Sequence, residues 1–597
     1  MTLRKNAASS LSVIIYIFWV LLGSSICAAQ SNTYHPIPEK GPLGYVSDKN
    51  CKHGPTNRAC WGGGFDVATN FGVKWPDTGK VVEYHLEITN TTLAPDGFER
   101  LVLAVNGQFP GPTIRAEWGD TVRIHVKNNM QNNGTSIHWH GIRQKYTNQQ
   151  DGTNGVTECP IPPGGSKTYE FKCTQYGTSW YHSHHTVQFV DLKSRRYGDG
   201  VLGAIVISGP ASANYDIDLG EMSIQDWYYR TAWQNALLGI PPVADNGLIN
   251  GTMVNANGGG KYHENVIKKG KSYLLRLINT SVDNYFKVHL DNHLFTVVSS
   301  DFVPIMPYQA DWLFIAIAGQ RYDVIIHADQ EIDNYWFRAE VQKGCGQNAM
   351  NGKIKSIFRY EGADPNANPT SVASNYTQGC DDEEGLIPFV PIDVPSDHFS
   401  QQAKDLNVSF QSEVSLPGQN IVHWRINGVP IETDWEYPTL QYVLDCNTSF
   451  PQRLNVIPLP EPNVWTYWII EASFESTVNV PHPIHLHGHD FSILGTGRGN
   501  FPGPEGLNFK NPARRDSVML PDHGWVAIAF PTDNPGAWLA HCHIAWHAHE
   551  GLAVQFLERS SEIPSALNIA QSWHHTCAQW KDYILDNAIY QQEGSGI

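Results

Sequence analysis

Four short histidine clusters occur in two pairs, one pair near each end of the sequence. The first pair is His138-Trp-His140 with His182-Ser-His184, and the second is His485-Leu-His487 with His541-Cys-His543. Because side chains two residues apart on a strand project from the same face, each cluster places two imidazoles together. One such pair is most simply a structural couple, but four pairs in matching contexts indicate a metal site. Imidazole binds copper, zinc, iron and nickel, so the pairs alone do not choose the metal.

Cys542 narrows the choice of metal. In His541-Cys542-His543 the cysteine faces away from both histidines, so a thiolate site and an imidazole site would lie on opposite sides of one strand. His547 lies five residues after Cys542, and His482 begins the preceding cluster. Two histidines and a cysteine describe an electron-transfer copper site, with zinc as the rival. Zinc has no redox chemistry and gives no reason to connect the thiolate to eight further histidines.

Short β-like runs separated by Gly, Pro, Asn and Asp clusters surround these motifs and predict an antiparallel sandwich or barrel. Four of these runs are Thr121–Val126, Leu202–Ile207, Phe491–Leu494 and Trp525–Phe530. Helical periodicity is weak except after Ile563. The repeated histidine pairs predict two related β-domains, with a third between them, because residues 211–365 carry strands but no His-x-His pair.

Length and composition agree with several β-rich domains. A chain of 597 residues is too long for one hydrophobic core, and 52 Gly and 37 Pro favour turn-rich β structure. There are 41 Lys and Arg against 58 Asp and Glu, a net charge of −17, and no basic run. We therefore expect no nucleic-acid partner.

The N-terminus predicts export. Arg4 and Lys5 precede an apolar run over 11–22 and then Cys27-Ala-Ala, which is typical of a signal peptide over residues 1–29. No later stretch approaches the ~20 apolar residues of a membrane helix, so we expect a soluble, secreted, extracellular protein without a membrane partner. Seven Asn-x-Ser/Thr sequons favour a secreted glycoprotein: Asn90, Asn133, Asn250, Asn279, Asn375, Asn407 and Asn447. Apart from Cys27 and Cys542, eight cysteines remain for disulfides; Cys51 with Cys60 is a plausible local bridge, and the connectivity is otherwise open.

The chain resembles the multicopper oxidases and, within them, the laccases of ascomycete fungi, over nearly all of the mature chain. The motifs that carry the resemblance are His138-Trp-His-Gly-Ile-Arg-Gln, Trp180-Tyr-His-Ser-His, His482-Pro-Ile-His-Leu-His-Gly-His and His541-Cys-His-Ile-Ala-Trp-His. The resemblance implies an all-β fold of three cupredoxin-like (Greek-key β-barrel or sandwich) domains. These would occupy residues 30–210 with an N-terminal extension, 211–370, and 371–563 with a linker, followed by a C-terminal segment over 564–597.

The resemblance also implies four copper ions, one of type 1, one of type 2 and two of type 3. The ligands carried over are His482, Cys542 and His547 for type 1; His138 and His485 for type 2; His140, His182 and His543 for one type 3 ion; and His184, His487 and His541 for the other. Electrons from the substrate would enter at His547 and pass through Cys542. Asp151 matches an acid that supplies protons near the type 2 ion, although Gln-Gln-Asp-Gly is also a plain turn sequence.

The implied function is a secreted, monomeric oxidase that takes single electrons from small phenolic or aromatic reductants and reduces O2 to water. Lignin-derived phenols, pigment precursors and plant phenolics are all open as natural substrates. One alternative is a ferroxidase, which needs carboxylates near His547. Another is a non-catalytic secreted cupredoxin protein that has lost its copper, which the complete set of eleven ligands opposes.

Several positions differ from the family pattern. Leu552 occupies the axial position of the type 1 site and cannot coordinate, which predicts a higher potential than a methionine would give. Trp233 stands where an acid is expected to hold the phenol, and Asp245 is the candidate substitute. The terminal Gly594-Ser-Gly-Ile597 is similar to a family tail that inserts towards the cluster, with Gly594 replacing the usual acid.

Disulfides follow from the same resemblance. It implies the pairs Cys51 with Cys60, Cys159 with Cys577, and Cys345 with Cys380. Cys173 and Cys446 have no obvious counterpart in the family pattern, and whether they pair with each other is open.

Overall fold

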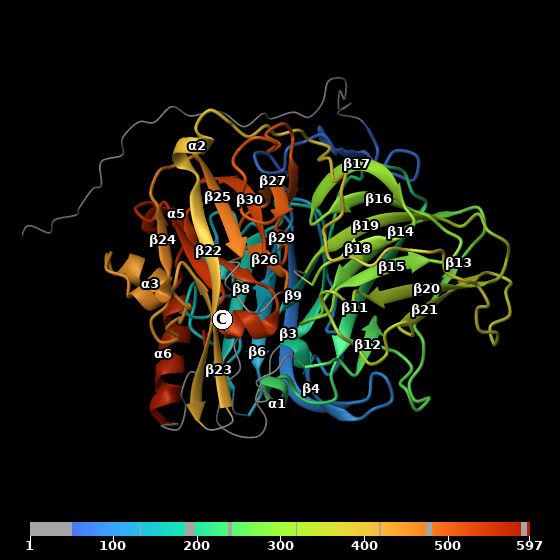
Figure 1. Ribbon diagram of the computed structural model, residues 1–597, viewed down its shortest axis with the longest axis horizontal. Coiled ribbons are helices and arrows are strands. Elements are labelled where there is room, and N and C mark those ends of the chain that lie inside the picture. Colours follow the sequence, from blue (N-terminus) through green and yellow to red (C-terminus); the bar gives the residue numbers. More distant parts are fainter. Residues whose placement is uncertain are drawn as a thin grey trace, which may run out of the picture. The chain divides into compact units, whose positions relative to one another are not determined.

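Strands are the main elements of the chain, as the alternation of apolar and polar residues predicts (Figure 1). In β6 (Thr121–Asn128), Val122, Ile124 and Val126 are buried while Arg123 and His125 face outwards. The computed structural model describes residues 51–597 except 132, 186–196, 237–241, 318, 417–418, 473–479 and 587–593. The predicted signal peptide lies outside these residues. All four β-like runs singled out above are strands, which confirms the all-β prediction.

The first pair of sheets lies within the predicted range 30–210. One sheet has the order β4 (Arg100–Val105), β3 (Val81–Leu93), β6 and β8 (Ser166–Lys172), and the other has the order β5 (Ile114–Glu117), β10 (Leu202–Ser208), β9 (Gly177–His182) and β7 (His138–Trp139). Apolar side chains from both sheets form one core, so the sheets face each other. A separate hairpin, β1 (Cys60–Gly62) with β2 (Phe65–Asp66), precedes them.

The second pair lies within 211–370 and has its own apolar core. One sheet has the order β12 (Asn246–Ile249), β11 (Ile217–Trp227), β14 (Ser272–Asn279), β19 (Arg321–His327), β16 (Phe295–Ser300) and β17 (Val303–Ala310). The other has the order β13 (Glu264–Ile267), β21 (Lys355–Tyr360), β20 (Asn334–Val341), β15 (Phe286–Leu290) and β18 (Leu313–Ile315).

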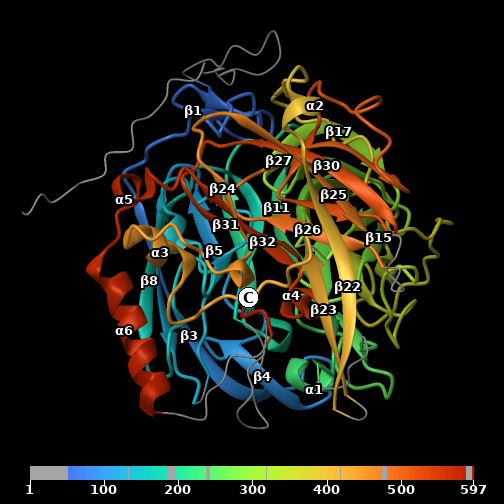
Figure 2. The same cartoon turned by 60° about the vertical axis from the view of Figure 1, so that its left-hand side comes forward.

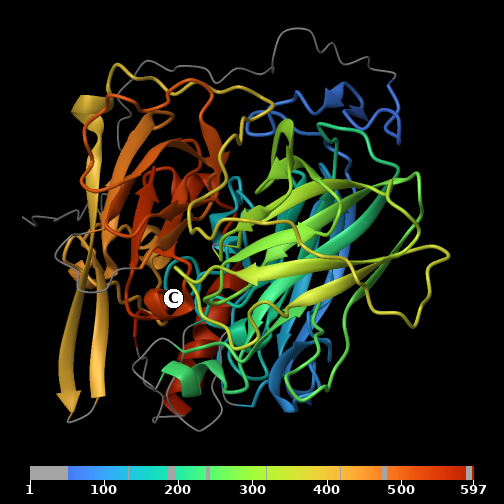
Figure 3. The same cartoon turned by 45° about the vertical axis from the view of Figure 1, so that its right-hand side comes forward.

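The third pair lies within 371–563. One sheet has the order β23 (Gln419–Ile426), β22 (Lys404–Leu416), β25 (Trp465–Ala472), β30 (Gly524–Pro531), β27 (Phe491–Arg498) and β28 (Ala513–Arg515). The other has the order β24 (Val456–Leu459), β32 (Ala553–Glu558), β31 (Gly536–Cys542), β26 (His482–Leu486) and β29 (Ser517–Leu520). The yellow-to-orange hairpin of β22 and β23 forms the edge of the first of these sheets (Figure 3). The core of this pair also takes in Trp180, Tyr228 and Tyr285 from the earlier sheets.

Helices are short, and the longest follows Ile563, as predicted. They are α1 (Ala232–Ala236), α2 (Phe399–Gln402), α3 (Thr439–Leu444), α4 (Ala545–His549), α5 (Ile563–Ala566) and α6 (Gln571–Asp586), with 3-10 turns at Asn148–Gln150, Tyr197–Asp199 and Gln452–Leu454. Figure 2 shows α6 beside β8 of the first sheet pair. Among the described helices, none combines the length and apolar character that a membrane crossing requires.

Three disulfides fasten the chain, and they are the three that the family resemblance implies. They join Cys51 to Cys60, Cys159 to Cys577, and Cys345 to Cys380. The second ties α6 to the first sheet pair. The structure answers the open question of Cys173 and Cys446, which do not pair: Cys173 is buried in the first core, whereas Cys446 is exposed after α3, and both are free thiols.

Candidate metal centre

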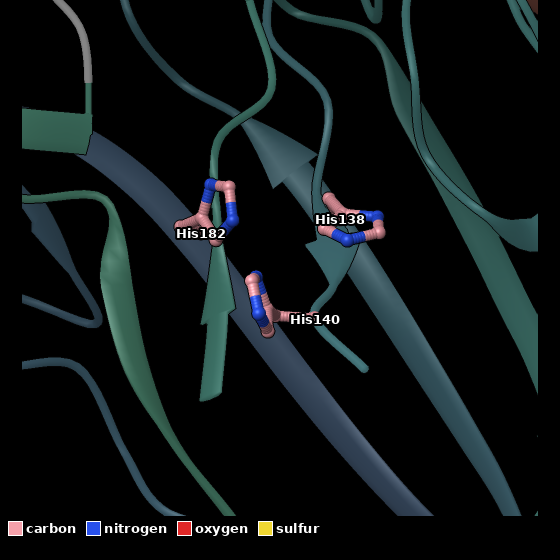
Figure 4. A group of neighbouring side chains, drawn as sticks. All are labelled: His138, His140 and His182. Atoms are coloured by element: carbon pink, nitrogen blue, oxygen red, sulfur yellow. The ribbon is translucent and has the colours of Figure 1, made fainter. Parts of the chain in front are cut away.

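The four histidine clusters stand at the ends of four strands, two in the first sheet pair and two in the third. On β7 and β9, His138 lies opposite His182, and on β26 and β31, His485 lies opposite His541. The second histidine of each cluster follows one or two residues beyond the strand end: His140, His184, His487 and His543. Figure 4 shows the imidazoles of His138, His140 and His182 around a common space.

Imidazoles from the first and third sheet pairs meet across this space. The rings of His138 and His487 stack with centroids 3.9 Å apart, as do those of His140 and His485. The centroids of His184 and His541 are 5.2 Å apart, and those of His182 and His543 are 5.4 Å apart. All eight side chains are buried. Neither sheet pair could form the cluster alone.

The nitrogens form groups of the size that a metal ion requires. Those of His184, His487 and His541 lie within 4.8 Å of one another, and this is the set that the resemblance implies for one type 3 ion. In the set implied for the other, the ring of His543 lies 5.2 Å from that of His140 and 5.4 Å from that of His182. His138 and His485, the set implied for type 2, form a group within 4.8 Å together with His487.

Hydrogen bonds on the outer side of the rings select the tautomer that binds metal. The Nδ1 atom of His138 donates to the backbone oxygen of Asp151 at 2.9 Å, and that of His485 donates to the backbone oxygen of Asp516 at 2.7 Å. Their Nε2 atoms are buried and accept no hydrogen bond from any described residue. Buried nitrogen lone pairs that point towards one another are typical of the side chains that bind a metal ion. The residues therefore fit a metal cluster.

Burial favours the neutral form of His485, His487 and His541. Desolvation, reinforced by the neighbouring histidines, lowers the pKa of His485 and His487 well below the usual value. Desolvation lowers the pKa of His541 to about 4. Neutral imidazole is the form that coordinates a metal, so these three side chains are in the form that binds metal ions at neutral pH.

The other face of β31 carries a thiolate site. The Cys542 sulfur lies 3.7 Å from Nδ1 of His482 and 3.6 Å from Nδ1 of His547, and these two nitrogens are 3.2 Å apart. Burial raises the pKa of the Cys542 thiol, and coordination by a metal ion would remove its proton outright. The strand alternation thus places Cys542 with one site and its neighbours His541 and His543 with the other.

An apolar shell closes the thiolate site. Leu552 is fully buried, and its backbone accepts a hydrogen bond from the Cys542 amide at 3.0 Å. The Trp424 ring packs against both His482 and His547 at 4.6 Å. Leucine and the tryptophan ring offer no ligand atom, so the site has the three ligands of a His2Cys centre.

Asp151 joins the two halves of the cluster. One carboxylate oxygen accepts from Nδ1 of His487 at 2.8 Å and from the Thr153 hydroxyl at 2.8 Å. Its backbone oxygen accepts from His138. Gly152, at φ +80°, permits this close approach, because a Cβ there would lie 1.8 Å from the Ile137 backbone oxygen. The carboxylate is therefore positioned beside the cluster by a turn that needs glycine.

Sequence reasoning missed Asp516 and its partner Arg321. The Arg321 guanidinium donates two hydrogen bonds to the Asp516 carboxylate, at 2.8 and 2.7 Å, and both side chains are buried. The backbone oxygen of Asp516 accepts the hydrogen bond from Nδ1 of His485. Arg321 comes from β19, so the second sheet pair supports the cluster although it supplies no histidine. The one signal was the run Arg514-Arg515-Asp516 before an apolar strand, since buried charges require partners.

A second, largely buried charge group joins the first and third sheet pairs. Asp533 accepts from Arg143 at 3.0 Å and lies 3.0 Å from the Lys145 ammonium. Burial alone would raise the pKa of Asp533, but Arg143 and Lys145 lower it well below its usual range. Arg143 follows the His138–His140 cluster closely, so this ion pair helps to hold that cluster against the third sheet pair.

Asp245 and Trp233 are the residues that the sequence singled out for holding a phenol. Asp245 accepts a hydrogen bond from the Tyr229 amide at 2.7 Å, and Trp233 lies in α1. Asp283, which the sequence did not single out, lies against Trp546, the residue before His547. Burial first, and then Asp226, raises the pKa of Asp283 well above its usual range.

The chain end reaches the neighbourhood of the cluster. The backbone oxygen of Gly596 accepts from the Trp435 indole at 2.7 Å, and Ile597 is buried in the same apolar group as Trp435. The ring of Trp435 also stacks on His185, the residue after the His182–His184 cluster, with centroids 4.5 Å apart. One tryptophan therefore links the terminal residues to the cluster segment.

The fold and these sites define a copper-binding oxidase, and comparison with known proteins agrees. Three multicopper oxidase family models match residues 87–212, 221–363 and 423–562. The chain belongs to the multicopper oxidase family. Laccase-3 of Botryotinia fuckeliana is 55% identical over 467 residues, 75% of this chain and 100% of that protein. A laccase of Neurospora crassa is 45% identical over 568 residues, 91% of this chain and 89% of that protein.

A solved structure agrees with these relatives. The crystal structure of the laccase from Botrytis aclada has a TM-score of 0.83 and 41% identity, covering 92% of this chain and 100% of that chain. The protein is accordingly an oxidoreductase of the laccase type, a copper enzyme with cupredoxin-like domains.

Proposed function

We propose that the two sites hold four copper ions in the distribution that the resemblance implies. The type 1 ligands are His482, Cys542 and His547. The remaining three ions take the eight histidines His138, His140, His182, His184, His485, His487, His541 and His543. When bound, copper supplies one-electron oxidation at the thiolate site and four-electron reduction of O2 to water at the histidine cluster. The observation that carries this proposal is that one strand presents Cys542 to the first site and its two neighbours to the second.

His547 is the residue through which a reductant would deliver its electron. It is 9% exposed, the largest fraction among the eleven ligands. Cys542 is fully buried, and the backbone connects it directly to His541 and His543. Electrons that reach Cys542 therefore have a short covalent route to the cluster, while the apolar shell keeps water away from the sulfur.

Asp151 is positioned to hold and pass a proton at the cluster. Its carboxylate faces His487 and Thr153, and its backbone orients His138. O2 reduction consumes protons, and a carboxyl group within hydrogen-bond reach of the cluster is the group that can supply them. We assign Asp151 this role in addition to its role in orienting the two rings.

The reductants are small phenols or related aromatics, with O2 as the electron acceptor. We further propose that the chain is secreted and acts as a monomer, without a nucleic-acid or membrane partner. The N-terminal signal pattern and the net charge of −17 support this. Three disulfides suit an oxidising compartment.

Oxygen uptake with a methoxyphenol tests the proposal. We expect four phenols oxidised per O2 without peroxide release, and intense visible absorption from the copper–thiolate bond. Cys542→Ser should abolish both absorption and turnover, whereas His327→Ala, which changes an exposed histidine on β19, should alter neither. Faster turnover of Fe(II) than of the phenol would favour a ferroxidase. A purified protein without copper or visible absorption would favour a non-catalytic cupredoxin.

A further inference from the structure

A separate histidine cluster lies on the outer face of the sheet β4-β3-β6-β8. His85 on β3 and His125 on β6 are direct partners on parallel strands, and Glu83 precedes His85 by two residues on the same face. The intervening residues of both strands pack into the first core. Glu83, His85 and His125 therefore project away from that core, on the opposite face of the strands.

The three side chains converge on one point. Their ligand atoms lie within 4.8 Å of one another, and the two imidazole rings stack with centroids 4.7 Å apart and planes inclined by 20°. A Glu83 carboxylate oxygen lies 2.5 Å from Nε2 of His125. The side chains of Glu83 and His125 are 49% and 32% exposed, so a hydrated ion can reach them.

A hydroxyl group orients one of the rings. Nδ1 of His125 lies 2.8 Å from the Thr168 hydroxyl on the neighbouring strand β8. With Nδ1 donating to this hydroxyl, Nε2 offers its lone pair to an ion once the proton that it shares with Glu83 has left. Hydrogen bonding of the distal ring nitrogen is a regular feature of histidines that bind metals.

The nearest cations are engaged by other partners. The Arg123 guanidinium pairs with Glu170 at 2.5 Å, and the Lys127 ammonium donates to the backbone oxygen of Gly164 at 2.5 Å. Glu83 is left to face His125. The hydrogen bond from His125 lowers the pKa of Glu83, so the carboxylate is in the ionised form that a metal requires.

We propose that Glu83, His85 and His125 form a surface site for one divalent transition-metal ion of the zinc class, separate from the oxidase centre. Two imidazoles and a carboxylate, with water in the fourth position, form a common zinc ligand set, at about 2.0–2.2 Å from the ion. The ion would take the place of the proton shared by Glu83 and His125, and that proton would leave to solvent. The bound ion would cross-link the side chains of the paired strands β3 and β6.

Zinc binding to the copper-loaded enzyme tests this proposal. Zn²⁺ alone is the probe, because it is redox-inactive and the oxidase sites are already filled. Titration calorimetry and metal analysis after gel filtration should give one zinc ion per chain, with a higher midpoint of thermal unfolding when zinc is present. His85→Ala, His125→Ala and Glu83→Gln should each weaken binding at least about tenfold, since loss of even an outer partner costs that much.

Controls separate this site from other surface histidines and from the copper centres. His327→Ala removes an exposed histidine outside the cluster and should bind zinc as the parent does. Copper content and visible absorption should be unchanged in every variant. The proposal is overturned if the parent binds no zinc at a tenfold excess, or if His85→Ala and His125→Ala retain the parent's affinity and stoichiometry.

Discussion

The ion pair between Arg321 and Asp516 connects the second sheet pair to the residue that orients His485. The variant Arg321→Met measures how much this ion pair contributes to the stability of the fold. Two hydrogen bonds of 2.8 and 2.7 Å join the groups, whose side chains are 1% and 2% exposed. The variant leaves the Asp516 carboxylate buried without its bidentate partner, which costs about 3–5 kcal/mol. For a domain the size of residues 371–563, this lowers the midpoint of thermal unfolding by roughly 10 °C. Near-UV circular dichroism of the copper-loaded protein measures the change.

Two further variants make this prediction specific. In Arg321→Met with Asp516→Asn, a neutral amide no longer needs a counter-charge, so the double variant should be more stable than the sum of the single effects by about 0.5–3 kcal/mol. Lys510→Met breaks an ion pair with Asp393 whose side chains are 85% and 53% exposed, and it should cost less than about 1 kcal/mol. The reasoning is refuted if Arg321→Met is no more harmful than Lys510→Met, or if the single effects simply add.

Three other variants test the remaining parts of the account. Arg143 and Lys145 lower the pKa of Asp533 in the folded protein. Its carboxylate therefore stabilises the fold at pH values above the unfolded pKa of about 3.9, and this stabilisation is lost as the pH falls through the folded pKa. The thermal deficit of Asp533→Asn should therefore be largest near neutral pH and shrink in acid; a constant deficit in a pH series of melting curves would contradict this. Leu552→Met offers a weak thioether ligand in a fully buried position, so redox titration should give a lower type 1 potential, and an equal or higher potential would count against the axial assignment. Asp151→Asn should retain the visible absorption but lower the rate of O2 reduction about 100-fold or more, and near-normal turnover would remove its proton-delivery role.

Local patterns were sufficient to predict much of the site. The alternation of a strand separates Cys542 from His541 and His543, and the structure places them on two sites as that alternation requires. The pairing of His138 with His182 and of His485 with His541 then follows from neighbouring strands. The first of these features depends on spacing within three residues, which a sequence displays directly, whereas the strand pairing joins segments that are far apart in the chain.

Long-range contacts could not be predicted in this way. Arg321 and Asp516 are far apart in the chain, and no spacing rule connects a residue of β19 with one that precedes β29. The relation between Cys173 and Cys446, which have no obvious family counterpart, was likewise open from the sequence. The structure shows that no disulfide forms between them, because one thiol lies inside a core and the other lies on the surface, out of reach of each other.

Anomalous diffraction at the copper absorption edge tests the central claim most directly. Crystals of the protein purified with copper should give four copper peaks per chain, one between His482, Cys542 and His547 and three among the eight histidines of the cluster. A cluster with fewer than three peaks, or a thiolate site without copper in an active preparation, would contradict the assignment.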